Sequence, residues 1–289
     1  VIALYRESYL RQIVSILCFF LVASFGLYWQ KENRRHLEKE HLYYLSEVAQ
    51  SEATAIERRI YSVFAATHFL AFEVKQNNGG NFNFDDYAKE VINSIGGISN
   101  LQLAPNGIVS QVYPAKGSEF KVGHSLLTDK KTYTTAKLVK QTRQLSLDGP
   151  FKTRQGNIAV IGRNPVFITK NNEESFWGFA SAMITLDDLL VSTKFSELDQ
   201  RRYAYQLSRV HPETKKQDVF ARSTSNIIEP FIIKKINLPN ASWTLTISSS
   251  DNNWSAQSNF LSNIFWGLLM VLAASYMLLK PKQLKSSVN

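Results

Sequence analysis

Three basic side chains fall close together on one predicted β-hairpin, in the stretch LDGPFKTRQGNIAVIGRNPVFI. Lys152, Arg154 and Arg163 would line a pocket formed on the sheet. An arginine in such a pocket can bind a carboxylate or a phosphate through two parallel N–H groups. The alternative is that these side chains face solvent or pair with nearby acids, namely Asp129, Asp148 and Glu119.

No catalytic motif accompanies these basic residues. The sequence has no nucleophile elbow, no P-loop and no zinc-protease motif. Its single cysteine, Cys18, excludes an intramolecular disulfide and a cysteine-based metal site. The histidines are scattered, and His36 and His41 are not spaced as a helical metal pair would be. We therefore expect that this segment is not an enzyme and holds no metal and no cofactor.

The positive net charge, +9, is spread along the chain rather than gathered into one basic block with interleaved aromatic residues. We therefore expect no nucleic-acid partner. A cationic surface close to the anionic headgroups of a lipid bilayer explains the charge at least as well.

Two apolar segments, residues 13–29 and 260–279, contain no charged residue. Crossing a bilayer takes about 20 helical residues, so both are predicted transmembrane helices, the first at the short end of the range. A cleaved secretory signal is the alternative for the first segment. Basic residues before the first and after the second segment favour both ends in the cytoplasm. The predicted location is therefore the inner (cytoplasmic) membrane, multi-pass, with residues 30–258 extracytoplasmic.

The region between these segments begins with apolar residues at helical spacing and without Pro or Gly, which predicts a long stalk helix over residues 30–76. The stripe is narrow, so it would pack either against a second copy of the helix or onto the chain's own domain. Both alternatives remain open at this point.

Strand patterns follow the stalk. An Asn-Gly turn between two β-prone runs, in ISNLQLAPNGIVSQVYP, predicts a hairpin at residues 98–114. Further strands with short helices among them predict an α+β fold with two antiparallel-sheet lobes, residues 77–190 and 191–258. Residues 1–12 would be a cytoplasmic tail. Residues 280–289 would start a cytoplasmic region, with the output domain beyond the end of this chain.

Several stretches resemble the CHASE domain, the extracellular sensory domain of histidine kinases and nucleotide cyclases. In the order seen in that family they are LQLAPNGIVSQVYP, VGHSLL, DGPFKTRQGNIAVIGRNPVF and FWGFASAMITLDDLL. YQLSRVHPET and NLPNASWTLTI resemble the continuation in bacterial members. The resemblance implies a stalk helix, two PAS-like lobes flanked by two transmembrane helices, a homodimer, and a small ligand bound by the membrane-distal lobe.

Plant members of that family bind cytokinins through an acidic residue on a helix and positions on the hairpin that carries the Pro-Phe pair. The counterparts here and their neighbours are Asp129, Arg154, Arg163 and Lys152, with Leu103 and Tyr113 as scaffold or pocket wall. Arginines replace Leu-like and Thr-like contacts, so the expected ligand is polar or anionic rather than a cytokinin.

The predicted function is therefore the sensory input module of a transmembrane receptor. Its output would be cyclic-di-GMP turnover by GGDEF and EAL domains, or a histidine kinase. A docking module for a periplasmic protein is the alternative, and a membrane-anchored enzyme is a third.

Overall fold

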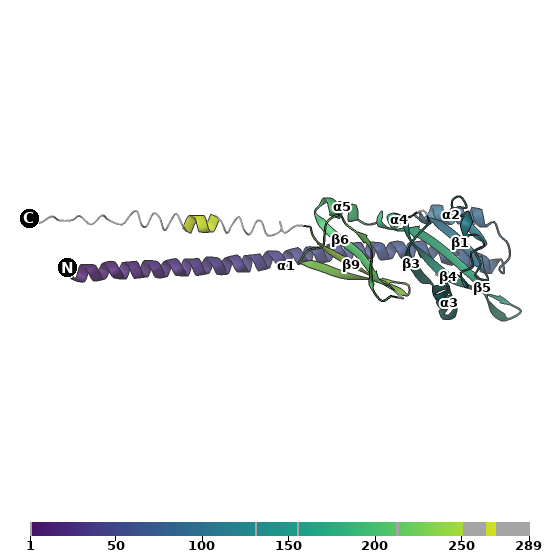
Figure 1. Cartoon of the computed structure of the whole chain (residues 1–289), viewed down its shortest axis with the longest axis horizontal. Helices are drawn as coiled ribbons and strands as arrows, with labels where there is room; N and C mark the ends of the chain where they lie inside the picture. The colour runs from purple at the N-terminus through teal and green to yellow at the C-terminus, as the bar shows by residue number, and fades with distance from the viewer. Residues whose placement is uncertain (1, 131, 155, 212–213, 251–263, 270–289) are drawn as a thin grey trace, which may run out of the picture. The chain divides into compact units, whose positions relative to one another are not determined.

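The computed structural model describes residues 2–130, 132–154, 156–211, 214–250 and 264–269. Its first helix, α1 (Ile2–Gln76), is 75 residues long. The chain forms two compact units, and the larger one, Leu45–Ser250, contains both β-sheets (Figure 1). The predicted α+β class, the two antiparallel sheets and the long N-terminal helix are confirmed.

The first sheet has five strands in the order β2-β1-β5-β4-β3, and every neighbouring pair is antiparallel. Its strands are β1 (Asn100–Pro105), β2 (Gln111–Tyr113), β3 (Ser146–Lys152), β4 (Ile158–Lys170) and β5 (Glu173–Thr185). The helices among them are α2 (Phe84–Ile95), the 3-10 turn η1 (Glu119–Lys121) and α3 (Tyr133–Thr142). β1 and β2 form the predicted hairpin, with Asn106 and Gly107 at positive φ in its turn.

The second sheet has four strands in the order β7-β6-β9-β8. Its strands are β6 (Tyr203–Val210), β7 (Gln217–Arg222), β8 (Phe231–Leu238) and β9 (Ala241–Ser249). Two short helices, α4 (Leu186–Leu190) and α5 (Phe195–Gln200), connect β5 to this sheet. The predicted lobe boundaries and the PAS-like character of the lobes stay predictions.

The stripe predicted on the stalk helix is its buried face. Ile56, Ile60 and Leu70 are completely buried in α1. They belong to one hydrophobic cluster with Leu101 of β1 and Leu245 of β9, so α1 packs on both of the chain's own sheets. Burying one such side chain contributes about 1.5–3 kcal/mol. Over this part of α1, packing on its own domain is therefore the alternative that holds.

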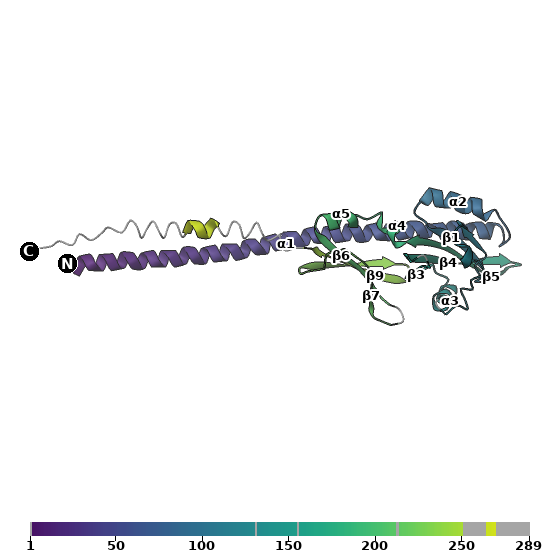
Figure 2. The same cartoon turned by 45° about the horizontal axis from the view of Figure 1, so that its top comes forward.

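The two faces of the first sheet are covered differently. α1 lies against one face, where Gly162 of β4 leaves room for Phe64; a Cβ on Gly162 would lie 2.4 Å from that ring. α3 lies on the opposite face (Figure 2) and packs Ala136 and Val139 against Phe179 of β5. This single short helix covers only part of the face, so the remainder of β3, β4 and β5 can be the floor of a cavity.

The prediction of a multi-pass protein of the inner membrane is wrong for the described part of the chain, where no helix is both long enough and apolar enough to cross a bilayer. Residues 13–29 are part of α1. Except for 264–269, the second predicted span, 260–279, lies outside the described residues.

Candidate functional site

The uncovered part of the first sheet forms the floor of a cavity of about 520 Å³. This volume is in the range of small-molecule sites, about 300–1,000 Å³. The floor comes from the middle of β1, β3, β4 and β5. One wall is the segment from η1 to the start of α3, and the other is the turn between β3 and β4. The wall segment is fixed to the β1–β2 hairpin, since Gly123 N donates to Val109 O at 2.7 Å.

Four of the predicted ligand-binding residues line this one cavity: Asp129, Lys152, Arg154 and Arg163. They come from different elements. Asp129 precedes α3, Lys152 ends β3, Arg154 lies in the following turn, and Arg163 is in the middle of β4. The fold therefore brings together residues that are up to 34 positions apart in the sequence.

Leu103 and Tyr113, which were also expected at the ligand site, are not among the residues that line this cavity. Successive strand residues point to opposite faces. Gln102 lines the cavity, and Leu103 accordingly faces α1, where it is 1% exposed. Tyr113 is the register partner of Leu101 and packs against the same cluster. Both residues belong to the scaffold that the alternative reading of the hairpin predicted.

Arg163 is the central polar group of the floor. Its side chain is 5% exposed, and its Nη2 lies 3.4 Å from Oδ2 of Asp148, a long contact for a charged pair. Its Nε and Nη1 have no hydrogen-bond partner among the described residues. The hydroxyl of Ser181, the register partner of Arg163 on β5, is likewise buried without a partner in the described part of the chain. A buried charge normally has its hydrogen bonds satisfied, because leaving them unmade costs stability.

The other predicted cations lie nearer to solvent. Lys152 and Arg154 are exposed, and the Arg154 guanidinium lies 4.5 Å from the centre of the Phe120 ring, at cation–π distance. Asp129 lies 3.8 Å from Nε2 of His124, which also lines the cavity. Of the ion pairs that the alternative named, the pair of Arg163 with Asp148 is present in the structure.

Sequence reasoning missed Lys121, the last residue of η1. Its ammonium points into the cavity and lies 3.8 Å from the thioether of Met183 on β5. Burial lowers the pKa of Lys121 to about 8, because the charged form loses hydration. No local signal marks this lysine, since its neighbours in GSEFKVGHSLL read as an irregular loop. Its position depends on the folding of that loop over β5.

A second cavity, of about 440 Å³, lies between α1 and the far end of β4. Four of its polar side chains already contact one another in pairs. Nδ2 of Asn164 lies 3.2 Å from Nδ1 of His68, and Arg143 pairs with Glu174. It contains none of the predicted site residues, so it is the less suitable candidate.

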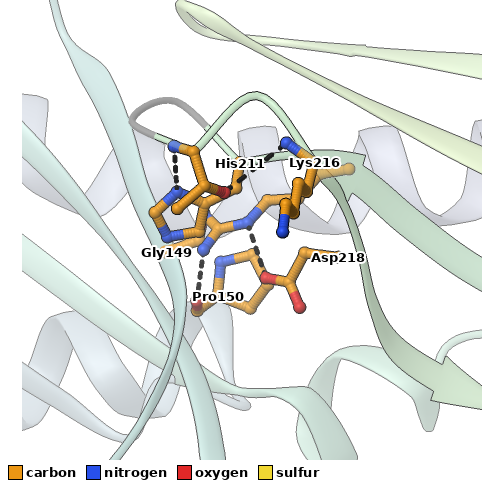
Figure 3. Close-up of polar contacts among 7 residues, drawn as sticks. Gly149, Pro150, His211, Lys216 and Asp218 are labelled. Atoms are coloured by element: carbon orange, nitrogen blue, oxygen red, sulfur yellow. Dashed lines mark hydrogen bonds and ion pairs between the residues drawn. The ribbon is translucent and has the colours of Figure 1, made fainter.

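The cavity floor is joined to the second sheet through an arginine of β6. Arg209 donates hydrogen bonds to the carbonyl oxygens of Gly149 and Pro150 in β3, the latter at 2.9 Å. Its Nε lies 3.4 Å from Oδ2 of Asp218 on β7. Figure 3 shows Gly149 and Pro150 beside Asp218 and the turn that carries His211 and Lys216. Residues 149–150 directly follow Asp148, so one short segment touches both Arg163 and the second sheet.

Comparison of the sequence with known protein families finds no match, and neither does comparison with curated proteins. Among solved structures, the fold is similar to that of an extracellular ligand binding receptor from Desulfohalobium retbaense DSM5692, with a TM-score of 0.52 and 13% identity. The similarity covers 72% of this chain and 40% of that one, so this chain spans well under half the length of the receptor. At this identity the likeness shows the fold alone, and membership of the CHASE family stays a prediction.

Proposed function

We propose that this chain is a sensory module that binds a small anionic molecule, a carboxylate, in the cavity on its first sheet. The observation that carries the proposal is Arg163, a buried guanidinium with two nitrogens unpartnered among the described residues, at the floor of a ligand-sized cavity. A carboxylate accepts two parallel N–H bonds from such a group. The fold shared with a solved extracellular ligand binding receptor supports a ligand-binding role.

The composition of the lining also supports an anion. Four cationic side chains line the cavity against two carboxylates, Asp129 and Asp148. Apolar side chains, among them Phe120, Ile161 and Met183, supply the surface for the carbon skeleton of the ligand. Ligand sites commonly combine an apolar lining with a few polar groups that fix orientation.

Signalling would follow from competition at Arg163. A bound carboxylate replaces Asp148 as the partner of Arg163, and Asp148 is then free to move with the irregular part of β3, where the register to β4 shifts. Arg209 holds the next two residues to β6, so such a movement is passed to the second sheet. The ligand shifts the population between the two positions of β3 only to the extent that it binds one of them more tightly.

Self-association is a further part of this proposal. Tyr61, Phe69 and Phe72 are 52%, 51% and 58% exposed on the side of α1 opposite its buried stripe. Several large exposed aromatic side chains on one side of a helix favour an interface. A homodimer formed through α1 explains these residues. The expected output domains, for cyclic-di-GMP turnover or a histidine kinase, would lie outside this chain, and this segment would itself not be an enzyme.

The direct test is a thermal-shift screen of the purified 289-residue chain against small carboxylates, phosphates, amino acids and neutral analogues. A carboxylate present at about 100 times its Kd stabilises the folded state by about 2.7 kcal/mol, which raises Tm measurably. Arg163→Gln should abolish the shift, whereas Arg222→Gln, at an exposed arginine of β7, should retain it.

Arg163→Lys is the companion variant, because it keeps the buried charge but loses the bidentate geometry. It should weaken carboxylate binding by roughly tenfold or more, as expected for loss of a hydrogen bond to a charged group. A carboxylate that binds Arg163→Gln as tightly as the wild type contradicts the proposed site. A library in which only neutral or cationic compounds stabilise the protein contradicts the proposed ligand class.

A further inference from the structure

The cavity contains a second cation besides the buried Arg163, the partly buried Lys121. The ammonium of Lys121 faces the thioether of Met183 at 3.8 Å, and no ion pair of Lys121 with a carboxylate is found within the described residues. A thioether is a weak acceptor, so it does not replace the water that the ammonium loses on burial. Lys121 therefore lacks a strong acceptor within the described residues, and so do Nε and Nη1 of Arg163.

These two groups are held on opposite sides of Ile161. Ile161 on β4 is in register with Asp148 on β3 and with Met183 on β5. Arg163 contacts Asp148, and Lys121 contacts Met183. The backbones of these two partners are two strand spacings, about 10 Å, apart. The floor therefore has a cation on each side and an apolar side chain in the middle.

The charge of the lining matches this geometry. With four cationic side chains and two carboxylates, the lining carries two positive charges in excess. A ligand with two negative charges neutralises it, whereas a monocarboxylate leaves one cation without a counter-ion. A phosphate group concentrates its charge at one point, whereas the two carboxylates of a short-chain dicarboxylate are separated by the carbon chain and match cations held on two sides of Ile161.

We propose that the cavity takes a short-chain dicarboxylate, with one carboxylate bound by Arg163, the other by Lys121, and the carbon chain over Ile161. The inference rests on the proposed function and names the ligand class of the same site. Lys121 then determines specificity, since it distinguishes a second carboxylate from an amide or a methyl group at that end.

Isothermal titration of the 289-residue chain with succinate, glutarate, succinamate, butyrate and inorganic phosphate tests this at pH 7. Succinate or glutarate should bind roughly tenfold or more tightly than succinamate and butyrate, because only they engage both cations. Lys121→Gln should remove this preference and leave the affinity for succinamate nearly unchanged. Lys121→Arg, which keeps the positive charge, should retain part of the preference. Lys116→Gln, at an exposed lysine shortly before η1, is the matched control and should change neither affinity.

The preference of the wild type for the dicarboxylate should also decline as the pH rises above about 8, where Lys121 loses its proton. This measurement needs no variant, so it tests the role of Lys121 even if Lys121→Gln does not fold. Three results would overturn the proposal of a dicarboxylate ligand: equal affinities for succinate and succinamate, a preference that does not depend on pH, or tighter binding of phosphate. Each of the three would leave the proposed carboxylate binding at Arg163 intact. Absence of saturable binding by every carboxylate would overturn the proposed function as well.

Discussion

Replacing Lys121 by methionine should stabilise the ligand-free protein, although it impairs the proposed site. The pKa of this lysine falls from 10.5 to about 8 on folding. A difference of one pKa unit corresponds to about 1.36 kcal/mol, so complete conversion would give roughly 3.4 kcal/mol. Part of the side chain is exposed and screened by solvent, which reduces the expected gain to about 1.5 kcal/mol at pH 7. Methionine is unbranched like lysine and one atom shorter, so it fills most of the same space beside Met183 without the charge.

The pH dependence separates this effect from better packing. Below about pH 8 the lysine is charged in the folded and the unfolded state, so the full cost of burying the ammonium is present. Between pH 8 and 10.5 the folded form is neutral while the unfolded form is still charged, and the cost declines. The advantage of Lys121→Met should therefore shrink towards pH 10.5, whereas an advantage from packing would not.

Urea unfolding of both proteins, followed by circular dichroism at pH 7 and pH 10 without ligand, measures these differences. Lys116→Met, at the exposed position, should leave the unfolding midpoint unchanged at both pH values. A Lys121→Met variant that is less stable than the wild type at pH 7, or equally stabilised at both pH values, would refute the reasoning that the ammonium is buried without compensation.

Three further substitutions test the packing that positions the site. Gly162→Ala should destabilise the protein by about 1–3 kcal/mol, because the added methyl group displaces the ring of Phe64. An unchanged midpoint of chemical unfolding would show that α1 does not lie this close to β4. Arg209→Gln should cost about 1.5–3 kcal/mol and increase amide exchange in β3, and unaltered exchange there would contradict the contact between the sheets. Glu52→Ala should lower the free energy of unfolding by about 1–3 kcal/mol, because the backbone amide of Lys194, which lies 2.8 Å from the Glu52 carboxylate, loses its acceptor. Glu52→Gln keeps an acceptor oxygen and should recover part of this stability in the same unfolding assay.

The sequence allowed the elements and most of the charged lining to be predicted, because both depend on local patterns. The stripe on α1 follows from helical spacing, and the β1–β2 hairpin follows from its Asn-Gly turn. Lys152, Arg154 and Arg163 lie on one predicted hairpin, so their proximity follows from the pairing of β3 with β4. These predictions did not require knowledge of which other segments lie nearby.

The remaining features depend on register and on long-range packing. Whether Gln102 or Leu103 faces the ligand is decided by which face of β1 lies on α1, and both faces of this strand are buried. Alternation of polar and apolar residues therefore could not identify the outward face. Lys121 reaches the cavity from an irregular loop, and its burial arises from contact with Met183, 62 positions away in the sequence. Periodic sequence patterns do not predict a contact of this kind.

Uncompensated charge is what distinguishes the candidate site from the other polar clusters of this protein. Asn164 and His68 contact each other in the second cavity, and Arg209 is satisfied by Asp218 and two carbonyl groups. Arg163 is buried and Lys121 is partly buried; within the described residues, two nitrogens of Arg163 have no partner, and the ammonium of Lys121 contacts a thioether, a weak acceptor. Since burying such groups lowers the stability of the empty protein, they are better explained by an anion bound in the functional state than by a structural role. On the proposed function, a ligand that supplies acceptors to both cations would also replace Asp148, the acid that Arg163 contacts in the ligand-free structure.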